Sequence, residues 1–343
     1  MTIKLVTSTQ QDDWNNFVIS NTQSAFYHLY QWKTIIERCF KFKTFYCMAL
    51  KDQQIQGILP LVLCDNIIFG RKLVSMPFLN FGGVCAVNQE AEVALLQRAK
   101  LITSRTRAKY LELRHTRRID EQLPVKTNKV SMTINLTPGY EKIWEKFSGN
   151  LRTEIRKAKT FGLEVRSGKE HYLDAFYHVF SRNYKIFGTP AIQKRFFRLI
   201  LEELSRYIKI FVVYFDDHLV GVAMNGYFKD TVEGMWAGSL SHIYPKLRIN
   251  YLLYWEMIKD ACQNAYSYFH LGRSTKDSGA QKFKEKWLAE PKQLYWEYYL
   301  NSSKKLPQLN VDNPNYQLPI KIWRRLPLNV TRMIGPVLAS GLP

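Results

Sequence analysis

The stretch YFHLGRSTKDSGAQKFKEKWLAEPKQL, residues 268–294, decides the fold of this chain. A short aromatic strand, predicted over 266–270, runs into a polar loop with a glycine at each end, 272–279. A helix with Phe283 and Trp287 one turn apart follows the loop. Helix N-terminal amides and fixed cations converge where a strand runs through such a loop into a basic helix, so this stretch is a candidate anion site.

Three lysines, Lys282, Lys284 and Lys286, lie on or beside this helix. Glu290-Pro291 is expected to end the helix before a last strand over 293–300, because proline cannot continue a helix interior. The lysines face either a bound anion or only solvent, and solvated basic helices are the commoner case. The residue pattern alone leaves both interpretations open.

The length and composition indicate a globular protein with more than one domain. The chain has 343 residues, of which 46% are hydrophobic and 23% charged, so it is long enough for two domains of ordinary size. It carries 49 Lys and Arg against 29 Asp and Glu, a formal charge of +20. That excess predicts a polyanionic partner: a nucleic acid, an anionic membrane surface or a phosphorylated substrate.

The cysteines and the apolar runs predict a cytosolic protein. No two cysteines have a short metal-binding spacing, so neither a zinc site nor a disulfide framework is expected. No apolar run approaches the ~18 residues of a membrane span, and the N-terminus has no hydrophobic signal core. The cysteines, most of them expected to be core thiols, are Cys39, Cys47, Cys64, Cys85 and Cys262.

Residues 1–136 are predicted to form a first domain. Its main feature is a hairpin of strands over 45–50 and 55–64. A strand over 73–78 then leads into 80–83, where paired glycines indicate either a tight turn or the close approach of a ligand. The other predicted elements are a strand at 3–7, helices through 30–36 and over 89–107, and a strand at 109–114.

Residues 137–300 repeat that order as a second domain, and 301–343 form a basic and apolar tail that is expected to pack back on the first domain. A helix over 150–161 is closed by Gly162. The other predicted elements are a helix starting at Thr137-Pro138, helices over 171–186 and 191–207, a meander over 208–215, 219–228 and 231–237, and a helix over 251–266 capped by Asn250.

Helix, antiparallel meander, helix, strand is the element order of the acetyltransferase-type α/β fold. We therefore expect an α/β (α+β) protein with two tandem acetyltransferase-like domains, whose mixed, largely antiparallel sheets are flanked by helices. Coenzyme A enzymes of this fold bind pyrophosphate on a glycine-rich turn after the meander. Residues 238–249 occupy that place without the paired glycines that let amides approach phosphate, which counts against ordinary acetyl-CoA chemistry.

Several short motifs occur together along the chain. They are GILPL at 57–61, SMPFLNFGG at 75–83, LRTEIRKA at 151–158 before Gly162-Leu163, FGTP at 187–190, LGRS at 271–274 with Gly279 and Phe283-Lys284, AEP at 289–291, WRRLP at 323–327 and Gly335-Pro336. In this combination the chain resembles the FemAB-like transferases, most closely the branch found with exosortase and PEP-CTERM systems in bacteria. The resemblance covers nearly the whole chain.

That resemblance implies transfer of an acyl or aminoacyl group to an amine or hydroxyl, without a covalent enzyme intermediate. In the peptidoglycan members the donor is aminoacyl-tRNA and the acceptor a nucleotide- or lipid-linked muropeptide. The lysine implicated there near the transferring carbonyl matches Lys284. The helical tRNA-arm insertion of some members is absent, because Leu204 passes to a strand at Ile208. The donor is therefore either aminoacyl-tRNA or acetyl-CoA, and no cofactor is firmly predicted.

Lys284 and His270 are the predicted catalytic residues. As a fixed cation, Lys284 would stabilise the negative charge that develops on the carbonyl oxygen; the alternative is a solvated helix lysine. His270 would accept a proton as a general base, because imidazole is the side chain best suited to that role near neutral pH; the alternative is a structural histidine. An amine acceptor that arrives deprotonated would need no protein base.

The predicted substrate-binding residues are basic, polar or aromatic groups within the motifs. Arg273 would either clamp a phosphate with two hydrogen bonds or pair with Asp277. Arg152 and Arg156 share one helix face, which either meets a phosphate or is a plain basic surface. The remaining candidates are Ser274, Phe283, Asn80, Gly82 and Gly83.

Two basic segments suggest other partners. The run of basic residues from Arg98 to Arg118, opposed only by Glu112, suits a nucleic acid or a membrane face. The tail from Ile320 to Leu338 mixes Trp323 and aliphatic residues with arginines, which favours either an anionic membrane interface or a strap packed on the first domain.

The favoured function is acyl or aminoacyl transfer to a cell-envelope glycan, peptidoglycan precursor or exopolysaccharide. The expected partners are tRNA or a phosphate-linked glycan precursor, with peripheral contact at the inner membrane face. The alternatives are an acetyl-CoA-dependent acetyltransferase and a non-catalytic basic protein that binds RNA or anionic lipid. The sequence predicts no metal.

Overall fold

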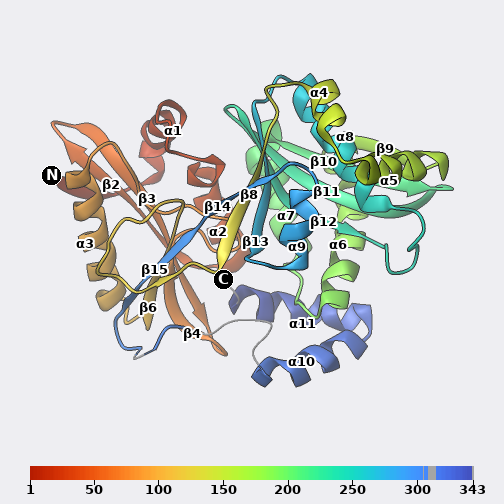
Figure 1. Cartoon of the computed structure of the whole chain (residues 1–343). Coiled ribbons are helices and arrows are strands. Elements are labelled where there is room, and N and C mark those ends of the chain that lie inside the picture. The colour runs from red at the N-terminus through yellow and green to blue at the C-terminus, as the bar shows by residue number, and fades with distance from the viewer. Residues whose placement is uncertain (304, 308–313, 342–343) are drawn as a thin grey trace. The chain divides into compact units, whose positions relative to one another are not determined.

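The computed structural model describes residues 1–303, 305–307 and 314–341 (Figure 1). The chain forms two compact units, each with its own sheet. The first unit comprises the described residues of 1–129, 293–313 and 337–343, and the second unit those of 130–292 and 314–336. The sequence-based boundaries at 136 and 300 follow element order, whereas these units follow packing.

An eight-stranded sheet forms the first unit, and it contains the predicted hairpin as β2 (Lys43–Lys51) and β3 (Gln54–Asn66). Next to the hairpin lie β4 (Gly70–Val74) and β6 (Tyr110–His115), which pair in parallel. The strand order is β1-β2-β3-β4-β6-β15-β7, with β5 paired to β3; the bounds are β1 (Thr2–Leu5), β5 (Cys85–Ala86), β7 (Val125–Lys126) and β15 (Tyr295–Leu300).

The core of the first unit lies between this sheet and α3 (Gln89–Arg105), whose buried face includes Leu95 and Ala99. Asn88 begins the helix, because its side chain accepts a hydrogen bond from the amide of Ala91. The predicted helix over 89–107 is thereby confirmed. The other helices of this unit are α1 (Gln11–Ser20) and α2 (Gln31–Phe40), with 3-10 turns at Ser8–Gln10 and Phe26–His28.

A seven-stranded sheet forms the second unit. Its centre is the predicted meander, β10 (Ile208–Phe215), β11 (His218–Phe228) and β12 (Thr231–Ser239). After the meander, β12 pairs in parallel with β13 (Tyr268–Thr275). The strand order is β14-β8-β13-β12-β11-β10-β9, with β8 (Lys129–Asn135), β9 (Glu164–Gly168) and β14 (Glu290–Gln293).

Helices pack against this second sheet in two groups. One group contains α5 and α8, whose apolar residues share a buried cluster with the sheet. In the other group, Phe196 and Phe197 of α7 contact the Trp236 ring of β12 edge to face. The helices are α4 (Tyr140–Lys146), α5 (Gly149–Thr160), α6 (Leu173–Phe187), α7 (Lys194–Leu204), α8 (Ile249–Gln263) and α9 (Gly279–Glu285), with 3-10 turns at Glu170–Tyr172 and Ser205–Tyr207.

The two sheets repeat one arrangement. The series β2-β3-β4-β6 in the first matches β10-β11-β12-β13 in the second, with three antiparallel strands followed by a parallel pair. Beyond the parallel pair, β15 and then β7 follow in the first sheet, and β8 and then β14 follow in the second. The α/β (α+β) class and the duplication predicted from element order are confirmed.

The strand in the stretch that decides the fold is longer than predicted. β13 runs to Thr275, so Gly272 to Thr275 lie in a strand and not in a loop. The helix α9 ends at Glu285, and Glu290-Pro291 lie in β14 instead of ending the helix. Proline is tolerated there because β14 is an edge strand of its sheet.

Two predicted helix starts were wrong. Thr137-Pro138 does not begin α4, because the amide and hydroxyl of Thr137 bind the side chain of Asn135 at 3.0 and 2.7 Å in a turn. Similarly, α8 begins after Arg248, which has φ +58°, and not after Asn250. The close of α5 at Gly162 (φ +78°) is confirmed.

The tail contains α10 (Pro314–Arg325) and α11 (Leu328–Gly341), and Pro319 lies inside α10. By packing, the described residues of 314–336 belong to the second unit and those of 337–343 to the first. Residues 304, 308–313 and 342–343 of the predicted tail lie outside the described residues. Within the described ranges, no helix is long and apolar enough to cross a membrane.

Candidate active site

The second unit contains a place where two parallel strands part. β12 and β13 are in register only from Thr231 with Tyr268 to Glu233 with His270, although β12 continues to Ser239 and β13 to Thr275. We call residues 234–239 and 271–275 the strand fork. The ladder between β12 and β13 ends at that residue pair, and two strands that part can admit another hydrogen-bonding chain or acyl group between them.

A bulge in β12 marks the start of the fork. Met224 of β11 pairs with Trp236, but the next residue, Asn225, pairs with Gly234, so Met235 is an extra residue in β12. Gly234 lies so close to β13 that an added Cβ would be 3.1 Å from the carbonyl oxygen of His270. The glycine therefore allows the close approach of the two strands just before they part.

His270 and Glu233 lie at the base of the fork. Both side chains are buried, and His270 Nδ1 donates a hydrogen bond of 2.5 Å to Glu233 Oε2. The carboxylate fixes the orientation of the ring and places a proton on Nδ1. The predicted histidine is thus an oriented, carboxylate-paired residue, while its role as a base stays a prediction.

Lys284 reaches the fork from α9. Its side chain is only 9% exposed, and Nζ donates to the carbonyl oxygens of Gly272 at 3.1 Å and Arg273 at 3.0 Å. Burial, and then the nearby charge of Arg273, lowers the pKa of Lys284 from 10.5 to about 8. The solvated alternative for Lys284 is therefore wrong, while its role at the transferring carbonyl stays a prediction.

Gly272 explains how the lysine is held. Its φ of +76° is a conformation that favours glycine, and its carbonyl oxygen accepts a hydrogen bond from Lys284. On the other side, Ser278 begins α9 by accepting a hydrogen bond from the amide of Gln281. Strand and helix are thus both fixed at the ends of the segment that carries the lysine.

Further polar residues gather around the fork. Ser274 is buried, and its Oγ has no hydrogen-bond partner within the part of the chain that the structure describes. Burial raises the pKa of Tyr184 in α6 to about 12, and the charge of Arg273 opposes that rise. Asn183, also in α6, donates to the carbonyl oxygen of Ser239 at 2.9 Å. Arg273 thus lies near Tyr184 of α6, and Ser239 of β12 is bonded to Asn183 of the same helix.

Phe283 belongs to an aromatic cluster. Its ring centroid lies 5.7 Å from that of Tyr251 and 5.3 Å from that of Tyr254, both in α8, and 6.2 Å from that of Trp287. These rings attach α9 to the core of the second unit. The contacts show Phe283 positioning the helix of Lys284, while substrate contact by Phe283 stays a prediction.

Arg152 and Arg156 lie on α5, whose apolar face packs in the core with α8. The guanidinium of Arg156 lies 5.5 Å from the ring centroid of Trp144 in α4. The structure therefore places Arg156 over an aromatic ring of a neighbouring helix and not along β13.

Asn80, Gly82 and Gly83 belong to the first unit. Asn80 Nδ2 donates to the hydroxyl of Tyr27 at 2.7 Å. A Cβ at Gly83 would overlap the ring of His115, and a Cβ at Gly82 would press on Met76. The paired glycines are thus explained by close internal packing, while His270, Arg273 and Ser274 lie in β13 and Lys284 contacts that strand.

Several backbone amides of the turn after β12 are bonded within the fold. The amide of Leu240 binds the carbonyl oxygen of Val220, and those of Ile243 and Tyr244 bind that of Leu240, all at 2.8 to 3.0 Å. Amides used in these turns are not presented to a phosphate. This agrees with the absence of paired glycines over 238–249.

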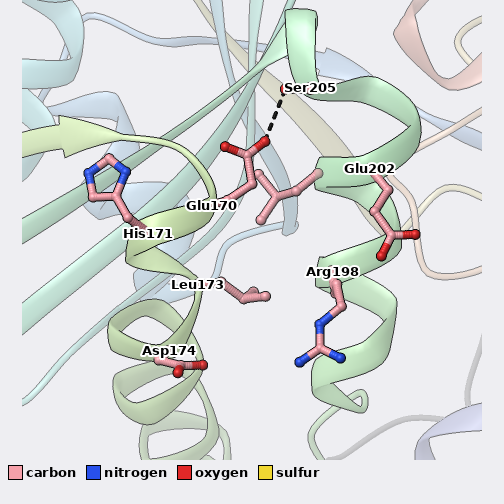
Figure 2. Close-up of a pocket in the computed structure, with 8 residues that line it drawn as sticks. Glu170, His171, Leu173, Asp174, Arg198, Glu202 and Ser205 are labelled. Carbon is pink, nitrogen blue, oxygen red and sulfur yellow. Dashed lines mark hydrogen bonds between the residues drawn. The ribbon is translucent and has the colours of Figure 1, made fainter.

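Two surface hollows of the second unit contain none of the predicted site residues. Figure 2 shows the first, a cavity of about 600 Å³ between α6 and α7, in which Glu170 accepts a hydrogen bond from Ser205. Glu202, Asp174 and Arg198 also line it. The second, about 450 Å³, lies at Trp144 and Trp255. Because acidic side chains prevail in the first, it does not suit a polyanion.

The basic run over 98–118 does not form one exposed cationic face. Arg114 is fully buried and pairs with Glu112 at 2.8 Å. Arg117 pairs with Glu92, and Lys100 with Asp120. The acidic partners Glu92 and Asp120 lie outside the run itself, which is why the sequence pattern showed only Glu112.

Sequence reasoning missed Glu233, Asn183 and Tyr184. Glu233 is a carboxylate inside the otherwise apolar and glycine-containing strand TVEGMWAGS, a pattern that signals a buried, paired acid. Asn183 lies three and four residues after the buried Phe180 and Val179, on the inward stripe of α6. Polar residues at buried positions were therefore the available signal.

Comparison with known proteins agrees with this geometry. Residues 145–285 match the family model described as an acetyltransferase (GNAT) domain. No curated protein matches the chain. Among solved structures, FemX has a TM-score of 0.65 at 14% identity, over 93% of this chain and 99% of that chain.

Two further solved structures share the fold. L-PGS from Bacillus licheniformis has a TM-score of 0.54 at 12% identity, over 89% of this chain and 96% of that one. A tandem GNAT protein from the clavulanic acid biosynthesis pathway has a TM-score of 0.52 at 8% identity, covering 87% and 97%. The chain thus has a tandem GNAT-like fold with an acetyltransferase-type second unit, and the comparisons support an acyltransferase.

Proposed function

We propose that this protein transfers an acyl or aminoacyl group to an amine or hydroxyl of a cell-envelope glycan, a peptidoglycan precursor or an exopolysaccharide. The reaction would take place on the cytoplasmic side of the membrane, as in the exosortase-associated branch of FemAB-like transferases. The observation that carries the proposal is the buried Lys284 ammonium, held by two carbonyl oxygens at the fork of β12 and β13.

The reaction is a direct displacement at a carbonyl. The acceptor's lone pair forms a bond to the carbonyl carbon, and the carbonyl π electrons move onto oxygen. The third N–H of Lys284 stabilises that oxyanion, because a fixed charge in a buried site acts in a low dielectric. Collapse of the intermediate breaks the bond to the donor's ester oxygen or thioester sulfur, which takes up the proton that the acceptor loses.

Two candidate nucleophiles of the second unit, Ser274 and Cys262, favour a route without an acyl-enzyme. Ser274 Oγ has no hydrogen-bonded base within the described residues. Burial raises the pKa of the Cys262 thiol to about 11, so that group is protonated at neutral pH. Neither residue has the activated nucleophile that a covalent intermediate requires.

Aminoacyl-tRNA is favoured over acetyl-CoA as the donor. The chain has a formal charge of +20, which suits a large polyanion, and the turn after β12 uses the amides of Leu240, Ile243 and Tyr244 internally. Aminoacyl-tRNA is therefore our first choice of donor, and acetyl-CoA the second. The acceptor would be a glycan or a phosphate-linked glycan precursor.

Direct donor binding tests this choice. We would titrate the purified protein with aminoacyl-tRNA, deacylated tRNA and acetyl-CoA at about 50 and 200 mM salt. Tight binding that depends on the aminoacyl group supports aminoacyl transfer, and binding of acetyl-CoA alone moves the proposal to acetyl transfer. Equal, salt-sensitive binding of both tRNAs would reflect only the basic charge.

A matched pair of lysine variants tests the catalytic role. Lys284→Met should reduce transfer at least about 100-fold, whereas Lys286→Met, two residues away and exposed, should leave it unchanged. A non-catalytic basic binding protein predicts the reverse: loss on charge reversal at Arg105 or Arg117, and none at Lys284.

A further inference from the structure

The C-terminal helices α10 and α11 expose a row of apolar side chains each. On α10 these are Leu318 and Ile322, four residues apart, and on α11 Met333, Ile334 and Val337. Leu318, Met333 and Val337 are 66%, 73% and 61% exposed. Residues that far apart on a helix lie on one face, so each helix presents an unpartnered apolar stripe.

The two helices form one hairpin. Trp323 of α10 is buried, and an added Cβ at Gly335 of α11 would lie 3.6 Å from its indole ring. Figure 1 shows the two helices beside the C-terminal end of α6. The helices therefore turn their apolar anchor Trp323 inward, while the exposed stripes face away from it.

Polar contacts fix this hairpin to α6 of the second unit. Lys185 Nζ donates to the carbonyl oxygen of Arg324 at 2.9 Å, and Arg332 Nε donates to Ser181 Oγ at 3.0 Å. The Arg332 guanidinium lies 5.7 Å from the ring centroid of Tyr177. Because these inward contacts already orient the hairpin, its exposed apolar stripes are presented as a fixed surface.

The charge on the hairpin has one sign. No Asp or Glu occurs after Asp312, while Lys321, Arg324, Arg325 and Arg332 are present. Lys321 and Arg325 are exposed and lie within one turn of Ile322. We call Leu318, Lys321, Ile322, Arg325, Met333 and Ile334, all of the second unit, the hairpin surface. It combines insertable aliphatic side chains with cations placed to meet phosphates.

We propose that the hairpin surface docks on an anionic lipid bilayer. Aliphatic side chains flanked by Lys and Arg match a bilayer interface, where the chains enter the acyl boundary and the cations meet anionic headgroups. A second copy of the chain would bring like charges together. Single-stranded nucleic acid would call for exposed aromatic rings, and none of the apolar side chains of this surface is aromatic. This proposal is independent of the transferase reaction.

Vesicle sedimentation of the full chain tests the proposal. Vesicles of phosphatidylcholine alone are compared with vesicles that contain about 30% phosphatidylglycerol. We expect binding to the anionic vesicles that exceeds binding to the neutral ones at least about tenfold, and that falls as salt rises. Ile322→Asp with Met333→Asp, and separately Lys321→Glu with Arg325→Glu, should each weaken binding at least about tenfold.

Matched controls separate the hairpin surface from general charge and from unfolding. Lys142→Glu with Lys146→Glu makes the same charge change on exposed residues of α4, and Ile67→Asp with Val93→Asp makes the same apolar change in the first unit. Both controls should bind vesicles like the parent. Thermal melting must show that all four double variants fold.

Four outcomes would overturn the proposal. The first two are equal binding to neutral and anionic vesicles, and binding to neither. The other two are hairpin-surface variants that bind vesicles like the parent, and control variants that lose as much binding as the hairpin-surface variants. A parent that binds no vesicles is also tested for a dimer by sedimentation velocity. If Ile322→Asp with Met333→Asp abolishes that dimer, the surface is assigned to a second copy of the chain. Variants of the hairpin surface that still bind tRNA but no longer bind vesicles would show that this surface is separate from the donor-binding site.

Discussion

The imidazole of His270 and the carboxylate of Glu233 are joined by a 2.5 Å hydrogen bond across the last residue pair that holds β12 and β13 together. One step further along, the strands part and Lys284 enters. The hydrogen-bonded pair at the last β12–β13 residue pair is thus also the base of the candidate active site. A substitution at Glu233 should therefore lower both the unfolding free energy and the transfer rate.

Glu233→Gln should lower kcat at least about tenfold, because the amide no longer fixes the ring with a charged acceptor. It should also cost about 1–3 kcal/mol of unfolding free energy, since a buried pair is disturbed. Glu297→Gln is the control, because Glu297 accepts a 2.6 Å hydrogen bond from the buried His115 of the first unit. That variant should lose stability and keep kcat; a loss of kcat in both would refute a special role for the Glu233 pair.

The transfer rate should fall as the pH rises through about 8. The pKa of Lys284 is lowered to about 8, so the ammonium that stabilises the oxyanion is lost above that pH. The rate should drop about tenfold per pH unit beyond it. A pH profile of kcat measures this, and Lys284→Arg should move the fall to higher pH. A rate that rises through pH 8 would instead make Lys284 a base.

Stability should move in the opposite direction with pH. The pKa of Lys284 is lower folded than its ordinary 10.5, so the unfolded chain binds more protons between about pH 8 and 10.5. The contribution of this lysine to unfolding free energy therefore rises across that window by about 3 kcal/mol. Denaturant titrations of the parent and Lys284→Met should show the parent's extra rise, and Lys284→Met should be the more stable protein at pH 7.

Gly83→Ala should destabilise the first unit by at least about 2 kcal/mol, because its Cβ would overlap the buried His115 ring. Gly149→Ala is the control, since nothing lies within 4 Å of an added Cβ at the start of α5. Thermal melting compares the two. Equal melting temperatures would show that the loop at Gly82-Gly83 moves freely away from β6.

Local signals in the sequence predicted the fold well where they act within a few residues. The conformations of the two turns in the meander, and of Gly162 after α5, depend on neighbouring residues. Both features were predicted at the correct positions. The predicted start of α8 was wrong because Arg248 adopts φ +58° and forms an ion pair with Glu154, a residue distant in sequence.

The candidate site was predictable only in part. Lys284, His270, Arg273 and Ser274 lie within one stretch, so a linear motif brought them together. Glu233, Asn183 and Tyr184 join them through parallel pairing of β12 with β13 and through α6, contacts that no spacing rule encodes. Asn80, Gly82 and Gly83 looked like site residues because close packing and ligand approach both call for glycine.

The position of β15 has a consequence for biosynthesis. This strand pairs with β6 and completes the first sheet, but the ribosome makes it only after every strand of the second sheet. Until residue 300 has emerged, the growing chain has an unsealed β6 edge. A nascent chain cut before β15 should be captured by chaperones or aggregate, so the first unit can mature only after the second has been translated.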